Sequence, residues 1–159
     1  MDNSHLKEIL SEKGSNITCP FAVFIKDNKV LNGFRHYKLD NGKTLSVWTC
    51  PGGRCEAGET VEETLRREVY EETGIKDFVI IRYIGRIEGA KKGDIGLIFL
   101  CESSQSPKLM EPEKFSEWKW VLIKDYIAGE SYSGFNPLAR KMITDYLLKI
   151  NQWKRPASG

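Results

Sequence analysis

Apolar positions along the chain change their spacing several times, and each change marks an expected element. Residues 1–17 are polar except for a short apolar face on residues 4–13, which predicts a helix too short to be stable alone. Runs rich in apolar residues follow at 21–25, 30–37 and 45–48, with turn-forming residues between them. These runs predict a hairpin followed by a third strand.

A helical period replaces this pattern between residues 60 and 73. Thr60 and Glu63 have the spacing of a capping box, which places the start of the helix at this point. Gly74 can adopt the left-handed conformation that ends a helix. Apolar residues recur every four positions in between, at Val61, Leu65 and Val69.

Two further runs, residues 78–87 and 95–101, predict a long hairpin across the turn-forming segment 89–94. A last strand is expected at residues 117–123, and a second helix from Pro137 onward. Strands before and after a central helix indicate an α/β fold, with a mixed sheet of about five or six strands lying between helices.

A single domain accounts for the 159 residues, of which 40% are hydrophobic. We expect a polar lead segment at 1–17, one domain at 18–153 and a C-terminal tail at 154–159. No apolar stretch reaches the roughly 20 residues that cross a bilayer, and the first thirty residues lack a secretory pattern. The sequence therefore predicts a cytoplasmic protein without membrane contact.

Charge and cysteine content exclude other classes. The net charge of +2 predicts no binding of a nucleic-acid polymer, and the four cysteines form no C-x-x-C pair. With only two histidines in the chain, an ordinary zinc site is not expected. In a cytoplasmic protein the cysteines are expected to be reduced thiols.

The predicted helix at 60–73 is acidic within a nearly neutral chain. Glu68, Glu71 and Glu72 stand at positions i, i+3 and i+4, so their carboxylates share one face and repel one another. Full solvation would make this face tolerable, and so would a divalent cation such as Mg²⁺, which prefers oxygen ligands. The sequence of the helix alone leaves both interpretations open.

The neighbouring residues favour the cation. Glycines at 52 and 53 allow the backbone to turn toward a ligand, and Arg67 can orient a carboxylate. From residue 53 to residue 75 the chain resembles the Nudix box, G-x5-E-x7-R-E-U-x-E-E-x-G-U with U a bulky apolar residue, without a departure. The fixed positions are Gly53, Glu59, Arg67, Glu68, Glu71, Glu72 and Gly74.

This resemblance implies an α/β/α sandwich, and a hydrolase that cleaves a nucleoside diphosphate linked to another group with the help of Mg²⁺ or Mn²⁺. Glu68, Glu71 and Glu72, together with a carbonyl of Gly52 or Gly53, would hold the cations. By the same resemblance Glu68 is the leading general base, although the base can lie outside the box in this family. Arg67 and Glu71 share the catalytic role, while Glu59 and Gly74 support the motif.

Candidate residues outside the box are less specific. The same resemblance implies an extra acidic ligand at Glu113, or at Glu111 as second choice, the alternative for both being a surface loop charge. Arg35 could meet a phosphate oxygen, although exposed strand arginines are common. Asn136 precedes Pro137 and suits a helix N-cap, yet its amide could also bond a purine edge.

Three aromatic residues could stack on a base or pack in the core: Phe34, Trp120 and Phe135.

The sequence therefore predicts a pyrophosphohydrolase of nucleoside or deoxynucleoside triphosphates, including oxidised purine nucleotides, that releases the monophosphate and pyrophosphate. ADP-ribose, sugar nucleotides and dinucleoside polyphosphates are the rival substrates. A nucleotide-binding sensor without turnover is the rival of another class. The expected partner is a small nucleotide, and a homodimer is suggested by the resemblance alone.

Overall fold

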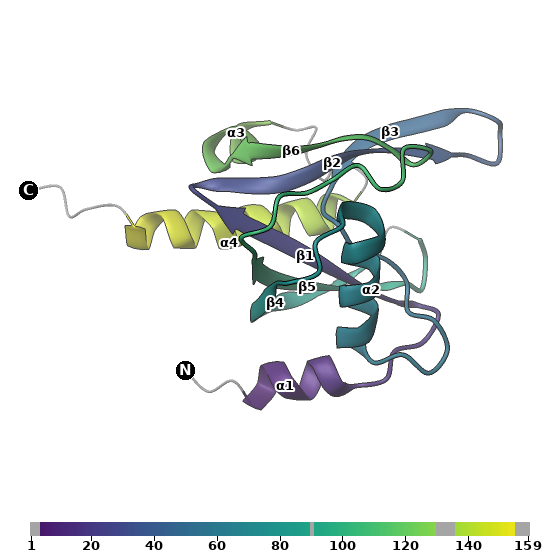
Figure 1. Ribbon diagram of the computed structural model, residues 1–159, viewed down its shortest axis with the longest axis horizontal. Coiled ribbons are helices and arrows are strands. Elements are labelled where there is room, and N and C mark those ends of the chain that lie inside the picture. The colour runs from purple at the N-terminus through teal and green to yellow at the C-terminus, as the bar shows by residue number, and fades with distance from the viewer. Residues whose placement is uncertain (1–3, 90, 130–135, 155–159) are drawn as a thin grey trace, which may run out of the picture.

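The computed structural model describes residues 4–89, 91–129 and 136–154 (Figure 1). Four helices and six strands are seen within these ranges. The helices are α1 (Ser4–Ser11), α2 (Val61–Thr73), α3 (Ile123–Ala128) and α4 (Pro137–Lys154). The strands are β1 (Thr18–Lys26), β2 (Lys29–Lys38), β3 (Thr44–Thr49), β4 (Val79–Glu88), β5 (Ile95–Glu102) and β6 (Phe115–Leu122).

The strands form one mixed sheet in the order β3-β2-β1-β5-β4, with β6 added to β2. β1 and β5 are parallel from Thr18–Ile95 to Phe24–Cys101, and every other pair is antiparallel. β1 meets β2 only next to their shared turn, at Ile25–Val30 and Lys26–Lys29. Among the described residues, the first part of β1 therefore has no strand partner on the side away from β5.

The glycine-rich loop after β3 occupies this free side of β1. Gly52 is bridged to Phe21, and the Gly53 amide donates to the Pro20 carbonyl at 3.1 Å. The Cys55 amide donates to the Thr18 carbonyl at 2.9 Å. The loop thus completes the edge of the strand and takes a fixed position.

Helices cover both faces of the sheet, which confirms the expected α/β sandwich (Figure 1). Alternation along β1 feeds two cores, because Phe24 points to one face and Val23 to the other. α1 and α2 cover the first core with Ile9, Leu10, Val61, Leu65 and Val69. α3 and α4 cover the second with Ile123, Tyr126, Ile143 and Leu147.

The ends of α2 are those that the sequence predicts. The Thr60 side chain accepts from the Glu63 amide at 3.1 Å, and the Glu63 carboxylate accepts from the Thr60 amide at 2.9 Å. Gly74 closes the helix at φ 73°, where its amide donates to the Tyr70 carbonyl. Both caps fix which residues of α2 face the sheet.

Some predicted boundaries are wrong. Residue 123 begins the helix α3, which the sequence did not predict, instead of ending a strand. α1 ends at Ser11, short of the predicted residue 13. α4 runs from Pro137 to Lys154, and residues 155–159 lie outside the described ranges. The division into segments at residues 17 and 153 stays a prediction.

All four cysteines are buried and lie outside any disulfide, in line with the expected reduced thiols. In the described ranges, no helix has the length and apolar content that would let it cross a membrane.

Candidate active site

Glu72 is the buried member of the three carboxylates on α2, with 3% of its surface exposed. Its Oε1 accepts from the Gly52 amide at 2.9 Å, and its Oε2 accepts from Arg35 Nη1 at 3.4 Å. Burial raises the pKa of Glu72 to about 8, and the hydrogen bond from Gly52 only partly opposes this. The protein alone therefore leaves this carboxylate short of positive charge.

Glu68 lies one turn earlier on α2, directly against the glycine-rich loop. A Cβ atom at residue 53 would stand 2.5 Å from Glu68 Cδ and 2.6 Å from its Oε2, so any other residue there would push the Glu68 carboxylate out of this position. Burial also raises the pKa of Glu68, against the effect of the neighbouring Arg67. Loop and carboxylate are thus packed as one unit.

Arg67 ties the motif together through its planar guanidinium. Its Nε and Nη2 donate to the two oxygens of Glu59 at 2.7 and 2.9 Å, and its Nη1 donates to Glu68 Oε1 at 2.9 Å. Nη2 also donates to the Arg54 carbonyl at 3.1 Å. The hydrogen bonds from Arg67 lower the pKa of Glu59 to about 2. Glu59 is thereby held ionised as the anchor of Arg67.

Glu71 points more toward solvent than the other two carboxylates, with 44% of its side chain exposed. Both of its oxygens lie 3.3 Å from Arg67 Nη1. A half-exposed glutamate held by one such contact can change rotamer at low cost. Its assignment as a cation ligand stays a prediction.

A cavity of about 400 Å³ opens beside Glu68, Glu72 and the two glycines. Its wall includes both cationic and apolar side chains, so it can contact charged and uncharged portions of a ligand. The cationic side chains are Arg35, Arg54, Lys91 and Lys114. The apolar residues include Phe21, Ile87, Ile98, Ala139 and Ile143.

A family model for the NUDIX domain matches residues 20–146 of this chain. The chain belongs to the Nudix family. Members of this family are hydrolases that act on pyrophosphate bonds of phosphorus-containing substrates. The acidic helix and the glycine-rich loop lie within the matched residues, and together with the adjoining cavity they form the candidate Nudix site.

Curated proteins with similar sequences carry names that state different activities. A MutT-like protein of Streptomyces ambofaciens is 37% identical over 83 residues, covering 52% of this chain and 49% of its own length. An NAD-capped RNA hydrolase, NudC, of Mannheimia succiniciproducens is 33% identical over 107 residues, or 65% of this chain and 39% of its length. The chain thus spans less than half the length of each of these two curated relatives.

A solved structure with the same fold is the MutT protein of Methanosarcina mazei. It superposes with a TM-score of 0.65 at 20% identity, covering 87% of this chain and 96% of its own. At this identity the likeness concerns the fold alone.

The acidic residues after β5 differ in their distance from the Nudix site. Glu113 is exposed and is not among the residues that line the cavity. Glu111 is half-buried, pairs with the cavity residue Lys114 at 3.2 Å, and its charge helps to raise the pKa of Glu72. The geometry therefore favours Glu111, the second choice from the sequence, over Glu113.

Asn136 lines the cavity and caps α4. Its Oδ1 accepts from the amides of Leu138 and Ala139 at 3.1 and 3.4 Å, as an N-cap does. Its Nδ2 donates to the Glu88 carbonyl at 3.1 Å. Both ends of the amide are thus engaged by the protein, so a contact with a base would require Nδ2 to leave Glu88.

Arg35 lies where the sequence suggested, in the cavity and beside Glu72, with its guanidinium over the rings of Tyr37 and Phe115. The aromatic candidates lie elsewhere: Phe34 packs on Trp48 and His36, and Trp120 packs against the first core. Phe135 lies outside the described residues.

Sequence reasoning missed the ion pair between Arg54 and Asp94. The two side chains meet through two hydrogen bonds of 2.7 Å at the edge of the cavity. Arg54 is one of the five unspecified residues of the motif, and Asp94 was assigned only to a turn. Lys91, from the turn-forming segment before β5, also lines the cavity. No motif spacing links positions so far apart in the chain.

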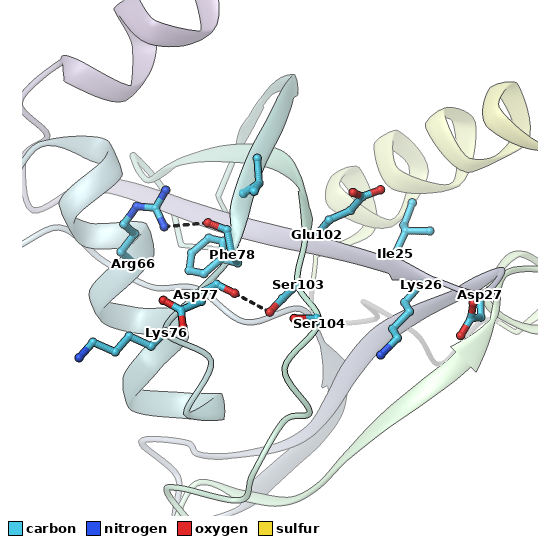
Figure 2. A pocket seen from close by; sticks show the side chains of 11 residues that line it. Ile25, Lys26, Asp27, Arg66, Lys76, Asp77, Phe78, Glu102, Ser103 and Ser104 are labelled. Atoms are coloured by element: carbon cyan, nitrogen blue, oxygen red, sulfur yellow. Dashed lines mark hydrogen bonds between the residues drawn. The ribbon is translucent and has the colours of Figure 1, made fainter.

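A wider groove of about 790 Å³ holds none of the candidate residues (Figure 2). It runs past Arg66 and Phe78, which are joined by a hydrogen bond from Arg66 Nη1 to the Phe78 carbonyl. Acidic and basic side chains are mixed along it, as with Lys26 and Glu102. This groove offers no grouping of catalytic side chains.

The donors at the Nudix site suit a hard divalent cation. Among the described residues, no group of three or more acidic, histidine or cysteine side chains converges as a ready-made metal site, since Arg67, Arg35 and Gly52 engage the carboxylates. The donors are nevertheless all oxygen, and two of them, Glu68 and Glu72, are carboxylates whose burial raises the pKa. A cation would relieve this shortage of positive charge.

Proposed function

We propose that the protein is a Mg²⁺-dependent pyrophosphohydrolase that converts nucleoside or deoxynucleoside triphosphates to the monophosphate and pyrophosphate. One observation carries this proposal. A single cavity joins two carboxylates of the Nudix helix, four cationic side chains and an apolar wall. A nucleotide presents the matching chemistry, with charged phosphates at one end and an apolar base at the other.

The cation would be held by Glu72, Glu68 and Glu71, with a backbone carbonyl of Gly52 or Gly53 and one acidic residue of the 111–113 segment. It would neutralise phosphate charge and acidify a water molecule, and Mn²⁺ would serve in its place. The buried Glu72 lines the cavity, and a bound cation would favour its ionised form, which burial disfavours.

Glu68 is the proposed general base. Burial moves the pKa of Glu68 upward, toward the pH at which a base must both accept and release a proton. Arg67 binds Oε1, which orients the carboxylate toward the cavity that Glu68 lines. Arg67 in turn is fixed by Glu59, whose own pKa is too low for it to take the proton.

Arg35, Lys91 and Lys114 would bind the phosphates, since guanidinium and ammonium groups donate strong hydrogen bonds to phosphate oxygens. The Arg54 guanidinium is engaged by Asp94. Phe21, Ile98 and Ile143 offer the apolar surface for a nucleoside. About 400 Å³ is at the small end of the roughly 300 to 1,000 Å³ of ligand sites, which supports a ligand with one nucleoside. This favours triphosphates over dinucleoside polyphosphates.

The other candidate substrates are ADP-ribose, sugar nucleotides and, from the likeness to NudC, NAD-type pyrophosphates. A panel of these compounds and of the common and oxidised triphosphates, incubated with Mg²⁺, separates the candidates by their products. The proposal expects monophosphate and pyrophosphate from a triphosphate. Phosphate with a diphosphate, or turnover of ADP-ribose alone, would contradict it. Binding without any turnover would indicate a sensor.

Glu68→Gln tests the proposed base. Its kcat should fall by about 100-fold or more, because proton transfer by a placed side chain contributes roughly 100 to 10,000-fold. Glu62→Gln is the matched control, since Glu62 lies on the same helix but pairs with Arg66 at 2.8 Å, away from the cavity. Near-native turnover in Glu68→Gln would remove Glu68 from this role.

A further inference from the structure

The ion pair between Arg54 and Asp94 joins the glycine-rich loop to the start of β5. Arg54 Nη1 donates to Asp94 Oδ1 and Nη2 to Oδ2, both at 2.7 Å, which is a bidentate pair. Nη1 also donates to the Asn16 carbonyl at 2.6 Å. The hydrogen bonds from Arg54 lower the pKa of Asp94, so the pair is ionised at neutral pH.

Asp94 is a fixed end of this pair. Its side chain is 9% exposed, and its carbonyl accepts from the Gly89 amide at 2.7 Å. The next residue, Ile95, donates to the Ile17 carbonyl at 2.7 Å and begins the parallel pairing of β5 with β1. Asp94 therefore stands on the central strands of the sheet and can hold the loop in place.

The other end of the pair leads to the proposed base. The Arg54 carbonyl accepts from Arg67 Nη2 at 3.1 Å, and Arg67 Nη1 donates to Glu68 Oε1 at 2.9 Å. The preceding residue, Gly53, leaves less room than a methyl group between its backbone and the Glu68 carboxylate. A displacement of the loop would consequently displace Glu68 as well.

We infer that Asp94, through its ion pair with Arg54, is a positioning residue that sets the place of the glycine-rich loop and hence of the Glu68 carboxylate. The inference rests on the proposed function. The arginine end of the pair is in contact with solvent, with 45% of the Arg54 side chain exposed, which moderates the loss of stability when the pair is broken. Its effect belongs to the geometry of the site.

The test compares Asp94→Asn, Arg54→Gln and the double variant Arg54→Gln/Asp94→Asn. Each single variant should lower kcat about 10 to 100-fold, as loss of a supporting hydrogen bond does, and change KM by less than about threefold. The double variant should be no worse than either single one, because both remove the same contact. Melting temperatures should stay within about 4 °C of the parent protein.

A second measurement does not depend on turnover. Binding of Mn²⁺, followed by the electron paramagnetic resonance signal of the free ion, should weaken about 10-fold or more in both single variants. Arg54→Lys keeps the charge but not the two-pronged contact, so it should recover only part of the loss. If Asp94→Asn fails to fold, Arg54→Lys and Arg54→Gln carry the test. Glu62→Gln, which breaks an ion pair outside the cavity, should match the parent protein.

Three results would overturn the inference. The first is unchanged kcat and Mn²⁺ affinity in the single variants. The second is additive losses in the double variant. The third is a rise in KM alone for Arg54→Gln with Asp94→Asn unaffected, since Arg54 would then contact the substrate directly. If the parent protein turns over no nucleotide, the proposed function fails, while the Mn²⁺ measurement still tests the positioning role.

Discussion

At the scale of single residues, Glu72 combines two opposing demands. It lies almost fully out of solvent, where an ionised carboxylate is costly, and it occupies a motif position that is expected to bind a cation as an anion. Burial raises its pKa to about 8. A proton and a cation should therefore compete for this side chain near neutral pH.

This competition predicts an unusual pH dependence of stability without metal. The pKa of Glu72 is about 8 in the folded protein and 4.5 ordinarily, so the protonated side chain favours the folded state. This contribution to the free energy of unfolding is complete below pH 4.5 and is lost as pH rises through 8. In EDTA the melting temperature should fall over this range. Glu72→Gln, which carries no charge to bury, should reduce the fall by at least about 2 °C.

The pKa of Glu68 is shifted in the same direction. Glu72→Gln should therefore reduce the dependence of melting temperature on pH without removing it. Melting curves at half-unit pH steps measure this directly. A slope in Glu72→Gln as steep as in the parent protein would mean that burial of Glu72 is not its origin.

Residues of the motif could be predicted from the sequence because their spacing is fixed within one helix and its preceding loop. Arg67, Glu59 and Glu68 meet as expected for that reason. Asp94 could not be found in this way, since its partner Arg54 is brought to it by the pairing of distant strands. The order of Glu113 and Glu111 as candidate ligands stays a prediction, because the spacing of residues in a loop does not determine that Glu111 pairs with the cavity residue Lys114 while Glu113 is exposed.

At the scale of elements, helix ends with side-chain caps were easier to predict than those without. α2 has a capping box and a left-handed glycine, both readable from the sequence. α3 has no side-chain cap at Leu122 and only six residues, and it forms because Ile123 and Tyr126 are buried in the second core. Tertiary packing of this kind leaves no local signal.

The cap of α4 separates two roles of Asn136. Asn136→Ala removes the acceptor for Leu138 and Ala139, which should cost about 1 kcal/mol, or about 2 to 4 °C in melting temperature. Asn136→Ser keeps a capping oxygen and should restore most of this stability. A serine lacks the paired donor and acceptor of the amide, so it should change the purine-to-pyrimidine turnover ratio by roughly 5 to 150-fold.

Both variants can be compared in one assay of nucleotide turnover beside a thermal melt. If Asn136→Ser is stable and its nucleotide preference is unchanged, Asn136 is a cap and a tether to Glu88 alone. Base recognition would then lie with other residues around the cavity.

At the scale of the whole molecule, a cation that binds only the folded protein should stabilise it. At a Mg²⁺ concentration about 100-fold above its dissociation constant, the melting temperature should rise by about 5 to 10 °C. The rise should be larger at pH 8 than at pH 6.5, because protons occupy Glu72 at the lower pH. Glu72→Gln should shrink it, and an equal rise in this variant would locate the stabilising ion elsewhere.

The pairing of β1 with β5 determines the stage of synthesis at which the site can assemble. Thr18 lies opposite Ile95, and the loop that carries Gly53 rests on the other side of β1. The ribosome synthesises the whole motif, residues 53–75, before it synthesises β5, the strand that pairs with β1. A nascent chain stopped before residue 95 therefore carries every motif residue without the sheet that assembles them, because non-local pairing comes only after the distant strand exists. Capacity for catalysis is acquired late in translation.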